Sequence, residues 1–371
     1  MHSTLYSFAF LLFGFIIATP AAIQAQADQQ WDAGEIMHQI EKLKVVGSAL
    51  YIAAHPDDEN TRLISYLSNE RKVRTGYLSL TRGDGGQNLI GPELRAPLGV
   101  IRTQELLAAR ELDGGEQFFT RANDFGYSKS PDETLEIWDE EKVLADMVWV
   151  IRKFRPDIII NRFDHRTSGT THGHHTSSAM LSMRAFDMAG DPKAYPEQLE
   201  YVDVWTPQRL YFNTSWWFYG SREAFQEADK SNLTSVDIGV YYPLLGTSNN
   251  EIAYAARSKH RCQGFGTELR RGEQSDYIEL IKGEWGEDQK DIFDPIDISW
   301  ERLYGGTGIS NLIKIAEQTY DPQKPEEILP LLLQIRTEIA SLDDPYWREV
   351  KLKQIENLIK ACAGLYLEAV T

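Results

Sequence analysis

The segment YIAAHPDDEN, residues 51–60, decides how the rest of the sequence is interpreted. The run Ser48 to Ala54 is short and apolar and contains no helix breaker, so it predicts a buried strand. Leu63, Ile64 and Leu67 follow at helical spacing. One histidine and three acids therefore lie where a strand ends and a helix begins. In open parallel sheets this is the position at which ligands bind.

Strands and helices are predicted to alternate along most of the chain. We expect strands at Val73 to Leu80, Glu116 to Thr120, Ile158 to Asn161 and Arg209 to Phe212, and helices at Arg102 to Leu112, Glu141 to Phe154 and Glu251 to Arg261. This alternation predicts an α/β fold, a three-layer, Rossmann-like, mostly parallel sheet with helices on both faces.

After Trp300 the pattern becomes purely helical. Stripes such as Leu332, Ile335 and Ile339 predict a C-terminal helical extension over residues 301–371. This extension either packs on the sheet domain or joins something outside this chain.

The first residues form a targeting pattern. Residues 5–18 are apolar and uncharged, and Ala25-Gln26-Ala27 resembles a cleavage site, so residues 1–27 are predicted to be a cleaved secretory signal peptide. An uncleaved anchor is the alternative, but the run falls short of the roughly 20 residues that a membrane span needs. We therefore expect a secreted or periplasmic protein without a span in the mature chain, with the α/β domain in residues 28–300.

Charge and cysteine content exclude two classes of site. Lys and Arg number 38 against 55 Asp and Glu, a net charge of −17, which argues against nucleic acid as a partner. No CxxC pair occurs, which excludes a cysteine zinc site. Cys262 and Cys362 could pair in an oxidising compartment, but Cys362 falls on an apolar stripe, where a buried free thiol is favoured.

Two strand-end clusters together suggest a metal site. His55 and Asp58 are three residues apart, with Pro56 fixing the bend between them. The tetrad His172-Gly173-His174-His175 follows the strand ending at Asn161, in a loop rich in glycine, serine and threonine, and a helix is predicted to begin after it at Thr176. A catalytic zinc takes three ligands of these types and keeps a fourth position open. Acids after a strand can also cap the next helix, and a histidine-rich loop can simply be solvated. The combination favours a metal because each cluster supplies what the other lacks.

The motif Ala54-His55-Pro56-Asp57-Asp58-Glu59, with its distant histidine tetrad, resembles the PIG-L/LmbE family of zinc-dependent N-deacetylases. Further similar elements are RTQEL (102–106), RPDIIIN (155–161), TSVDI (234–238) and KHRCQGFG (259–266). The signal peptide and helical tail resemble the secreted long-form subgroup, in which further C-terminal modules occur.

The resemblance implies a role for each matching residue. It implies one zinc ion per chain, with Asp57 as general base, His172 as acid or oxyanion stabiliser, Arg102 and Asp124 near the substrate, and His55, Asp58 and His175 as metal ligands. Glu59 is expected to orient its neighbours or to cap the following helix. One departure is His174, which stands where the family often has an acid, so the protonation state of His172 is open.

These features predict a zinc-dependent hydrolase that removes an N-acetyl group from an amino sugar, or from a glycan or glycoconjugate of the N-acetylglucosamine type. A zinc amidase acting on a larger N-acyl group is the alternative, and a non-catalytic carbohydrate-binding module with a degenerate site is another. The run Trp216-Trp217-Phe218-Tyr219 could stack on sugar rings or belong to the core. The expected partner is a small-molecule or glycan substrate, and oligomer contacts are left open.

Overall fold

The computed structural model describes residues 30–168, 171–266, 271–286 and 291–365. The predicted signal peptide lies outside these residues. The centre is a seven-stranded sheet with the order β3-β2-β1-β4-β5-β9-β6. Its strands are β1 (Ser48–Ala53), β2 (Arg74–Ser79), β3 (Glu116–Phe119), β4 (Ile158–Asn161), β5 (Arg209–Thr214), β6 (Leu233–Asp237) and β9 (Ser275–Lys282).

The first five strands in sequence are parallel, which confirms the predicted mostly parallel α/β fold. The two strands at the far edge were not predicted. Strand β9 runs antiparallel to both β5 and β6. A separate short hairpin pairs β7 (Tyr241–Tyr242) with β8 (Thr247–Ser248).

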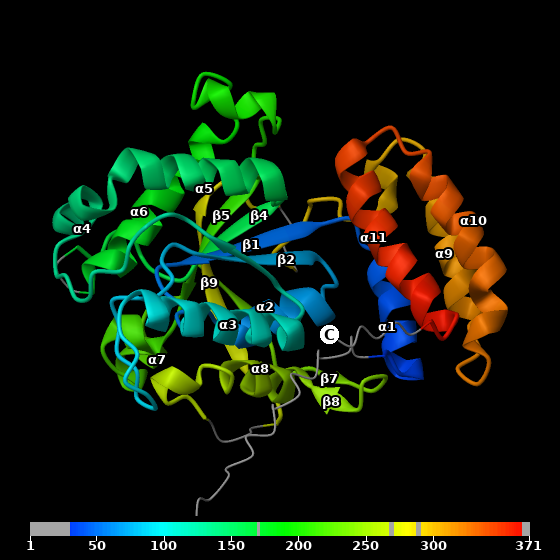
Figure 1. Ribbon diagram of the computed structural model, residues 1–371, viewed down its shortest axis with the longest axis horizontal. Helices are drawn as coiled ribbons and strands as arrows, with labels where there is room; N and C mark the ends of the chain where they lie inside the picture. The colour runs from blue at the N-terminus through cyan, green and yellow to red at the C-terminus, as the bar shows by residue number, and fades with distance from the viewer. Residues whose placement is uncertain (1–29, 169–170, 267–270, 287–290, 366–371) are drawn as a thin grey trace, which may run out of the picture.

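Helices cover both faces of the sheet, as expected (Figure 1). One face carries α4 (Pro131–Trp138), α5 (Glu140–Phe154) and α6 (Gly173–Met188), and the other carries α2 (Thr61–Asn69), α3 (Ala96–Asp113) and α8 (Asn249–Arg257). Helix α3 begins earlier than predicted, with Pro97 in its first turn. Helix α8 ends at Arg257, before the predicted Arg261, and a separate 3₁₀ turn follows. The short α7 (Arg222–Glu227) lies after β5.

The C-terminal helices form a second core. Helices α9 (Gly306–Thr319), α10 (Leu329–Ala340) and α11 (Pro345–Cys362) enclose buried side chains that include Ile335 and Ile355. Helix α1 (Ala33–Leu43), from the range expected to belong to the α/β domain, packs with them through Ile36 and Ile40. The helical unit is thus assembled from both ends of the described chain.

The helical unit is fixed where the strands of the sheet begin. The Arg302 guanidinium pairs with Asp157 just before β4, with Nη2 2.8 Å from Oδ1. Asp157 Oδ2 accepts a 2.9 Å hydrogen bond from the backbone N–H of Ser48 at the start of β1. Arg74, at the start of β2, donates to the Tyr346 hydroxyl at 2.7 Å. The tail therefore packs on the sheet domain, on the side where β1 and β2 start (Figure 1).

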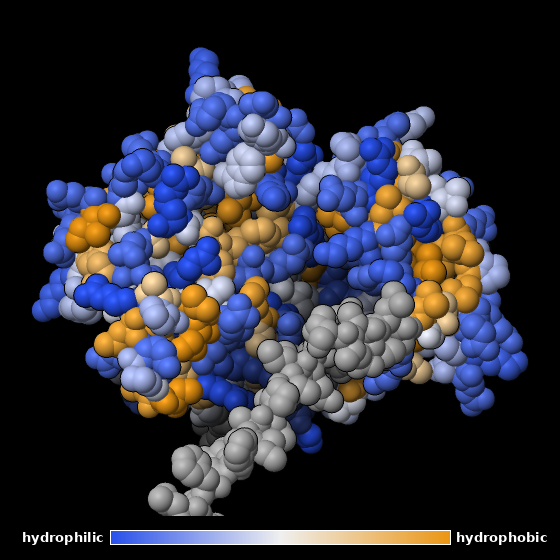
Figure 2. Space-filling view, in the orientation of Figure 1, coloured by the Kyte–Doolittle hydropathy of each residue, from blue (hydrophilic) through white to orange (hydrophobic). Residues whose placement is uncertain are grey.

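Hydrophilic side chains cover most of the face shown in Figure 2, with apolar residues gathered over the loop before α3 and over α9 and α10. Within the described part of the chain, no helix is long and apolar enough to cross a membrane. Both cysteines are buried and free, and Cys362 lies in the core of the helical unit.

Candidate active site

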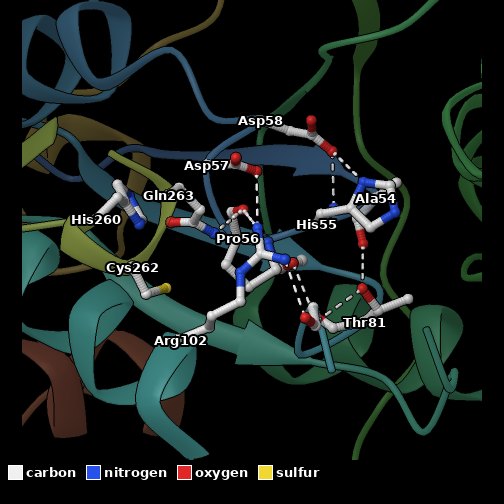
Figure 3. A network of polar contacts seen from close by, with 12 residues as sticks. Ala54, His55, Pro56, Asp57, Asp58, Thr81, Arg102, His260, Cys262 and Gln263 are labelled. Carbon is white, nitrogen blue, oxygen red and sulfur yellow. Dashed lines mark hydrogen bonds and ion pairs between the residues drawn. The ribbon is translucent and has the colours of Figure 1, made fainter. Parts of the chain in front are cut away.

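The HPDD segment forms a tight bend between the buried strand β1 and helix α2. Asn60 caps α2, because its side chain accepts from the backbone N–H of Leu63. Asp57 has a φ of 94°, a conformation that aspartate and asparagine adopt more readily than most residues. The bend makes the adjacent carboxylates point in different directions (Figure 3). Asp57 faces Arg102 at 3.2 Å, while Asp58 Oδ2 lies 3.0 Å from His55 Nδ1.

The histidine tetrad reaches the same place from the neighbouring strand. Strand β4 pairs with β1 in parallel, so the carboxyl ends of the two strands lie side by side. Helix α6 begins at Gly173, earlier than the expected Thr176, so His174 and His175 occupy its first turn and not a loop. The cause is His172, whose ring caps the helix by accepting from the backbone N–H of His174 at 3.1 Å.

The three expected metal ligands come together. One ligand atom from each of His55, Asp58 and His175 lies within 4.8 Å of the others. The Asp58 carboxylate is 3.0 Å from His55 Nδ1 through one oxygen and 3.5 Å from His175 Nε2 through the other. Tetrahedral zinc with ligand bonds of about 2.0–2.1 Å places its ligands roughly 3.3 Å apart. The donor set and its spacing therefore fit a zinc ion that keeps one position open.

A second group of potential ligands shares His55. His55, His172 and His174 also lie within 4.8 Å of one another. His55 Nε2 is 2.8 Å from His174 Nδ1, so these rings share a hydrogen bond. Only the group containing Asp58 offers a negative charge to a divalent cation, and we favour it for that reason.

The two adjacent aspartates differ in their acidity. Burial and repulsion from the Asp58 carboxylate raise the pKa of Asp57 to about 6. Burial opposes ionisation of Asp58 as well, but His175 and His55 hold the pKa of Asp58 well below its usual range. A carboxylate with a pKa near neutrality suits proton transfer, and a fully ionised one suits cation binding.

His172 is neutral in this arrangement. Burial, together with repulsion from His55 and His175, lowers the pKa of His172 to about 4. Its Nδ1 accepts a hydrogen bond from the helix, so the neutral ring carries its proton on Nε2. His172 can therefore donate an N–H hydrogen bond at neutral pH. Whether it acts as an acid or as an oxyanion stabiliser stays a prediction.

The two expected substrate residues lie behind the site. The Arg102 side chain is buried, and its guanidinium donates to the carbonyls of Gly83 and Pro56 at 2.9 and 2.7 Å (Figure 3). Asp124 is buried next to His174, at 3.8 Å, and accepts from the backbone N–H of Gly126 at 2.9 Å. A cavity lies beside the candidate metal ligands, and neither Arg102 nor Asp124 is among the described residues that line it. Arg102 thus holds the bend, and a contact of either residue with substrate stays a prediction.

A buried ionic cluster contacts the bend between β1 and α2, and this cluster was not predicted from the sequence. Glu59 is fully buried and does not cap α2, since Asn60 does so. Its carboxylate contacts His260 Nε2 at 2.6 Å and Arg110 at 3.4 Å. Burial opposes ionisation, yet His260 and Arg110 lower the pKa of Glu59 to about 2. The only signal in the sequence was the KHRCQGFG element, which supplies His260.

The cavity beside the candidate metal ligands has a volume of about 760 Å³. Asp57, Asp58 and His175 line it. Trp216 and Trp217, which follow β5, line it and are 41% and 50% exposed, so these two indoles are available to a ligand and are not in the core. Phe163 also lines the cavity and stacks on the His175 ring at 3.8 Å between centroids.

Part of the chain is similar to known proteins. The family described as PIG-L: GlcNAc-PI de-N-acetylase matches residues 50–186. A mycothiol S-conjugate amidase of Streptomyces coelicolor is 28% identical over 178 residues, which cover 44% of this chain and 59% of the relative. A 1D-myo-inositol 2-acetamido-2-deoxy-alpha-D-glucopyranoside deacetylase of Geodermatophilus obscurus is 31% identical over 168 residues, 40% of this chain and 55% of the relative. The chain thus spans a little over half the length of these relatives.

Among solved structures, the N,N'-diacetylchitobiose deacetylase of Pyrococcus horikoshii is similar, with a TM-score of 0.42 and 17% identity. The match covers 58% of this chain and 71% of that one.

Proposed function

We propose that this chain, which belongs to the PIG-L family through residues 50–186, is a zinc-dependent hydrolase. Its proposed reaction removes the N-acetyl group from an N-acetylglucosamine-type amino sugar or glycoconjugate. The observation that carries the proposal is the convergence of His55, Asp58 and His175, of which Asp58 and His175, together with Asp57, line an aromatic-lined cavity. The names of both curated relatives, an amidase and a deacetylase, support hydrolysis of an amide bond.

Zinc, when bound by His55, Asp58 and His175, would supply Lewis acidity that polarises an amide carbonyl and increases the acidity of water. The chain's own residues would do the rest. Asp57, with its raised pKa and a carboxylate that is not part of the ligand set, takes the proton of the attacking water and returns it to the amine nitrogen as the C–N bond breaks. The neutral His172 donates its Nε2–H to the oxyanion that develops on the carbonyl oxygen.

Arg102 keeps Asp57 in place. Its guanidinium contacts both the Asp57 carboxylate and the carbonyl of Pro56 in the same bend. Arg257 donates to the Asp57 carbonyl at 2.9 Å from the other side. These contacts hold a residue with an unfavourable backbone conformation, so the base is positioned before substrate arrives.

The test combines metal analysis with acetate release. The full chain, expressed with its N-terminal segment and collected after any processing, is analysed for zinc content and assayed against a panel of N-acetylated amino sugars. About one zinc per chain and release of one acetate per free amine formed are expected. A protein that binds zinc but releases only larger acyl groups would be an amidase with a different acyl specificity. A protein that binds sugar without metal or turnover would be a binding module.

The same preparation tests location. We propose that the protein is secreted or periplasmic, because of the apolar segment at residues 5–18 and its following small residues. Recovery of the protein from the cytoplasmic fraction with an intact N-terminus would contradict this.

A further inference from the structure

Several arginines that line the cavity have no acidic partner. Four arginines line it, namely Arg62, Arg162, Arg222 and Arg257. Four acids also line it, but each has a partner in the protein. Asp57 pairs with Arg102, Asp58 with two histidines, Glu59 with His260, and Asp276 accepts from Asn60 at 2.5 Å. Among the described residues, Arg62, Arg162 and Arg222 have no carboxylate within ion-pair distance.

Arg162 is the most informative of the three. It directly follows β4, is half-buried, and its backbone N–H donates to Ile52 of β1 at 2.9 Å, so its main chain is fixed at the end of the sheet. Its guanidinium has no hydrogen-bond or ion-pair partner among the described residues and lies 5.9 Å from the ring centroid of Phe218. The planar fork of donors on this guanidinium matches carboxylate, sulfate and phosphate groups.

Two further features make this part of the cavity a built site. Thr214, at the end of β5, is 2% exposed and lines the cavity, and its Oγ1 has no hydrogen-bond partner among the described residues. Trp216 lies two residues further along, and the Arg222 guanidinium packs on it at 5.2 Å from the ring centroid. Strands β4 and β5 are parallel neighbours, so the segments that carry Arg162 and Thr214 leave the sheet at the same edge.

We propose that this region is a subsite for an anionic group, a carboxylate, sulfate or phosphate, on the residue joined to the N-acetylated sugar. Arg162 is its principal ligand, Thr214 Oγ1 donates a further hydrogen bond, Arg222 lies at the same wall, and Trp216 and Trp217 offer ring faces to the sugar. The substrate is then an acidic N-acetylated glycan or conjugate and not a neutral one. This rests on the proposed function, since the acetamido group is placed at His55, Asp58 and His175.

The experiment uses two disaccharides that differ in one group. N-acetylglucosamine is linked either to glucose or to glucuronic acid, and acetate release gives kcat and KM for both. Glucose 6-sulfate and glucose 6-phosphate as second residues distinguish the source of the charge. For the wild type, kcat/KM for the preferred acidic compound is expected to exceed that for the neutral one by at least about tenfold, equivalent to about 1.4 kcal/mol. In Arg162→Met this ratio should fall toward one through KM, and Arg162→Lys should retain part of it.

Arg166→Met is the matched control. Arg166 is four residues away, is exposed, and already pairs with Asp164 and Glu279 at 2.7 Å each. It should keep the wild-type ratio. Thermal unfolding of each variant shows whether it folds, and Arg162→Lys serves if Arg162→Met does not.

The outcomes separate the subsite from the proposed function. Equal kcat/KM for neutral and acidic compounds in the wild type, or an unchanged ratio in Arg162→Met, would overturn the subsite while leaving deacetylation intact. If no compound is hydrolysed, calorimetric binding of the glucuronic acid disaccharide decides. If Arg162→Met weakens this binding at least about tenfold, the result supports the subsite and contradicts the proposed function. Binding that Arg162→Met does not change overturns the subsite as well.

Discussion

Replacement of Asp57 by asparagine separates the base from the metal ligands. Asparagine keeps the shape of the side chain and an oxygen that can accept from Arg102, and it tolerates the φ of 94° at this position. What it removes is the ability to take a proton. Zinc content, substrate KM and the melting temperature should therefore stay close to those of the wild type, while kcat falls.

The expected size follows from the role. Loss of a general base typically costs about 10²- to 10⁴-fold in rate, equivalent to roughly 3–5 kcal/mol of activation free energy. Asp57→Ala should lose as much activity and also some stability, because a left-handed backbone costs an ordinary residue about 1–2 kcal/mol. The difference in unfolding free energy between the two variants contains this backbone cost and the lost contact with Arg102, and it is independent of the chemical step.

The assay is acetate release under saturating substrate, with zinc measured on each protein as isolated. Asp58→Ala is the contrasting variant, because its carboxylate contacts both His55 and His175 and its loss should remove zinc together with activity. If Asp57→Asn is isolated without zinc while Asp58→Ala retains it, the two roles are reversed. If Asp57→Asn keeps full kcat, the proton is taken by another group.

Three further expectations concern the metal, the helical unit and pH. His175→Ala should weaken zinc binding at least about tenfold by loss of one of three ligands, and wild-type affinity in a competition assay with a chelator would show the third ligand to be wrong. Ile355→Ala should lower the unfolding free energy by about 2–5 kcal/mol with unchanged kcat, because Ile355 is fully buried in a core away from the cavity; an unchanged denaturant midpoint would contradict this. Burial, with nearby Lys42, lowers the pKa of Lys351 from 10.5 to about 7, so the unfolded chain binds the extra proton between these values and stability from this group should rise with pH from about 7 to 10. Lys351→Met should reduce the slope of unfolding free energy against pH in that window, and an identical slope would refute the assignment.

The sequence was sufficient to predict the secondary-structure elements whose side chains all lie in one environment. Strand β1 is buried at every position, so its apolar run without polar alternation identified it directly. Strands β6 and β9 escaped prediction because their exposure is mixed and neither forms a continuous buried run. Helix α6 was placed too late because capping by a histidine ring is not among the usual N-cap signals.

By itself, the sequence identified His55, Asp58 and the histidine tetrad as potential ligands, since metal ligation depends on residue type and on position after a strand, and the family resemblance selected His175 within the tetrad. Only the tertiary structure decided what lies behind that set. Arg102 faces the backbone of the bend, Asp124 faces His174, and Glu59 faces His260, which is 201 residues away along the chain. Whether a buried charge contacts substrate or its own protein depends on which distant side chains neutralise it. Local sequence does not show which residues far apart along the chain are close in space. For the same reason, the unpaired Arg162 could be recognised only once β4 and β5 were seen to lie side by side.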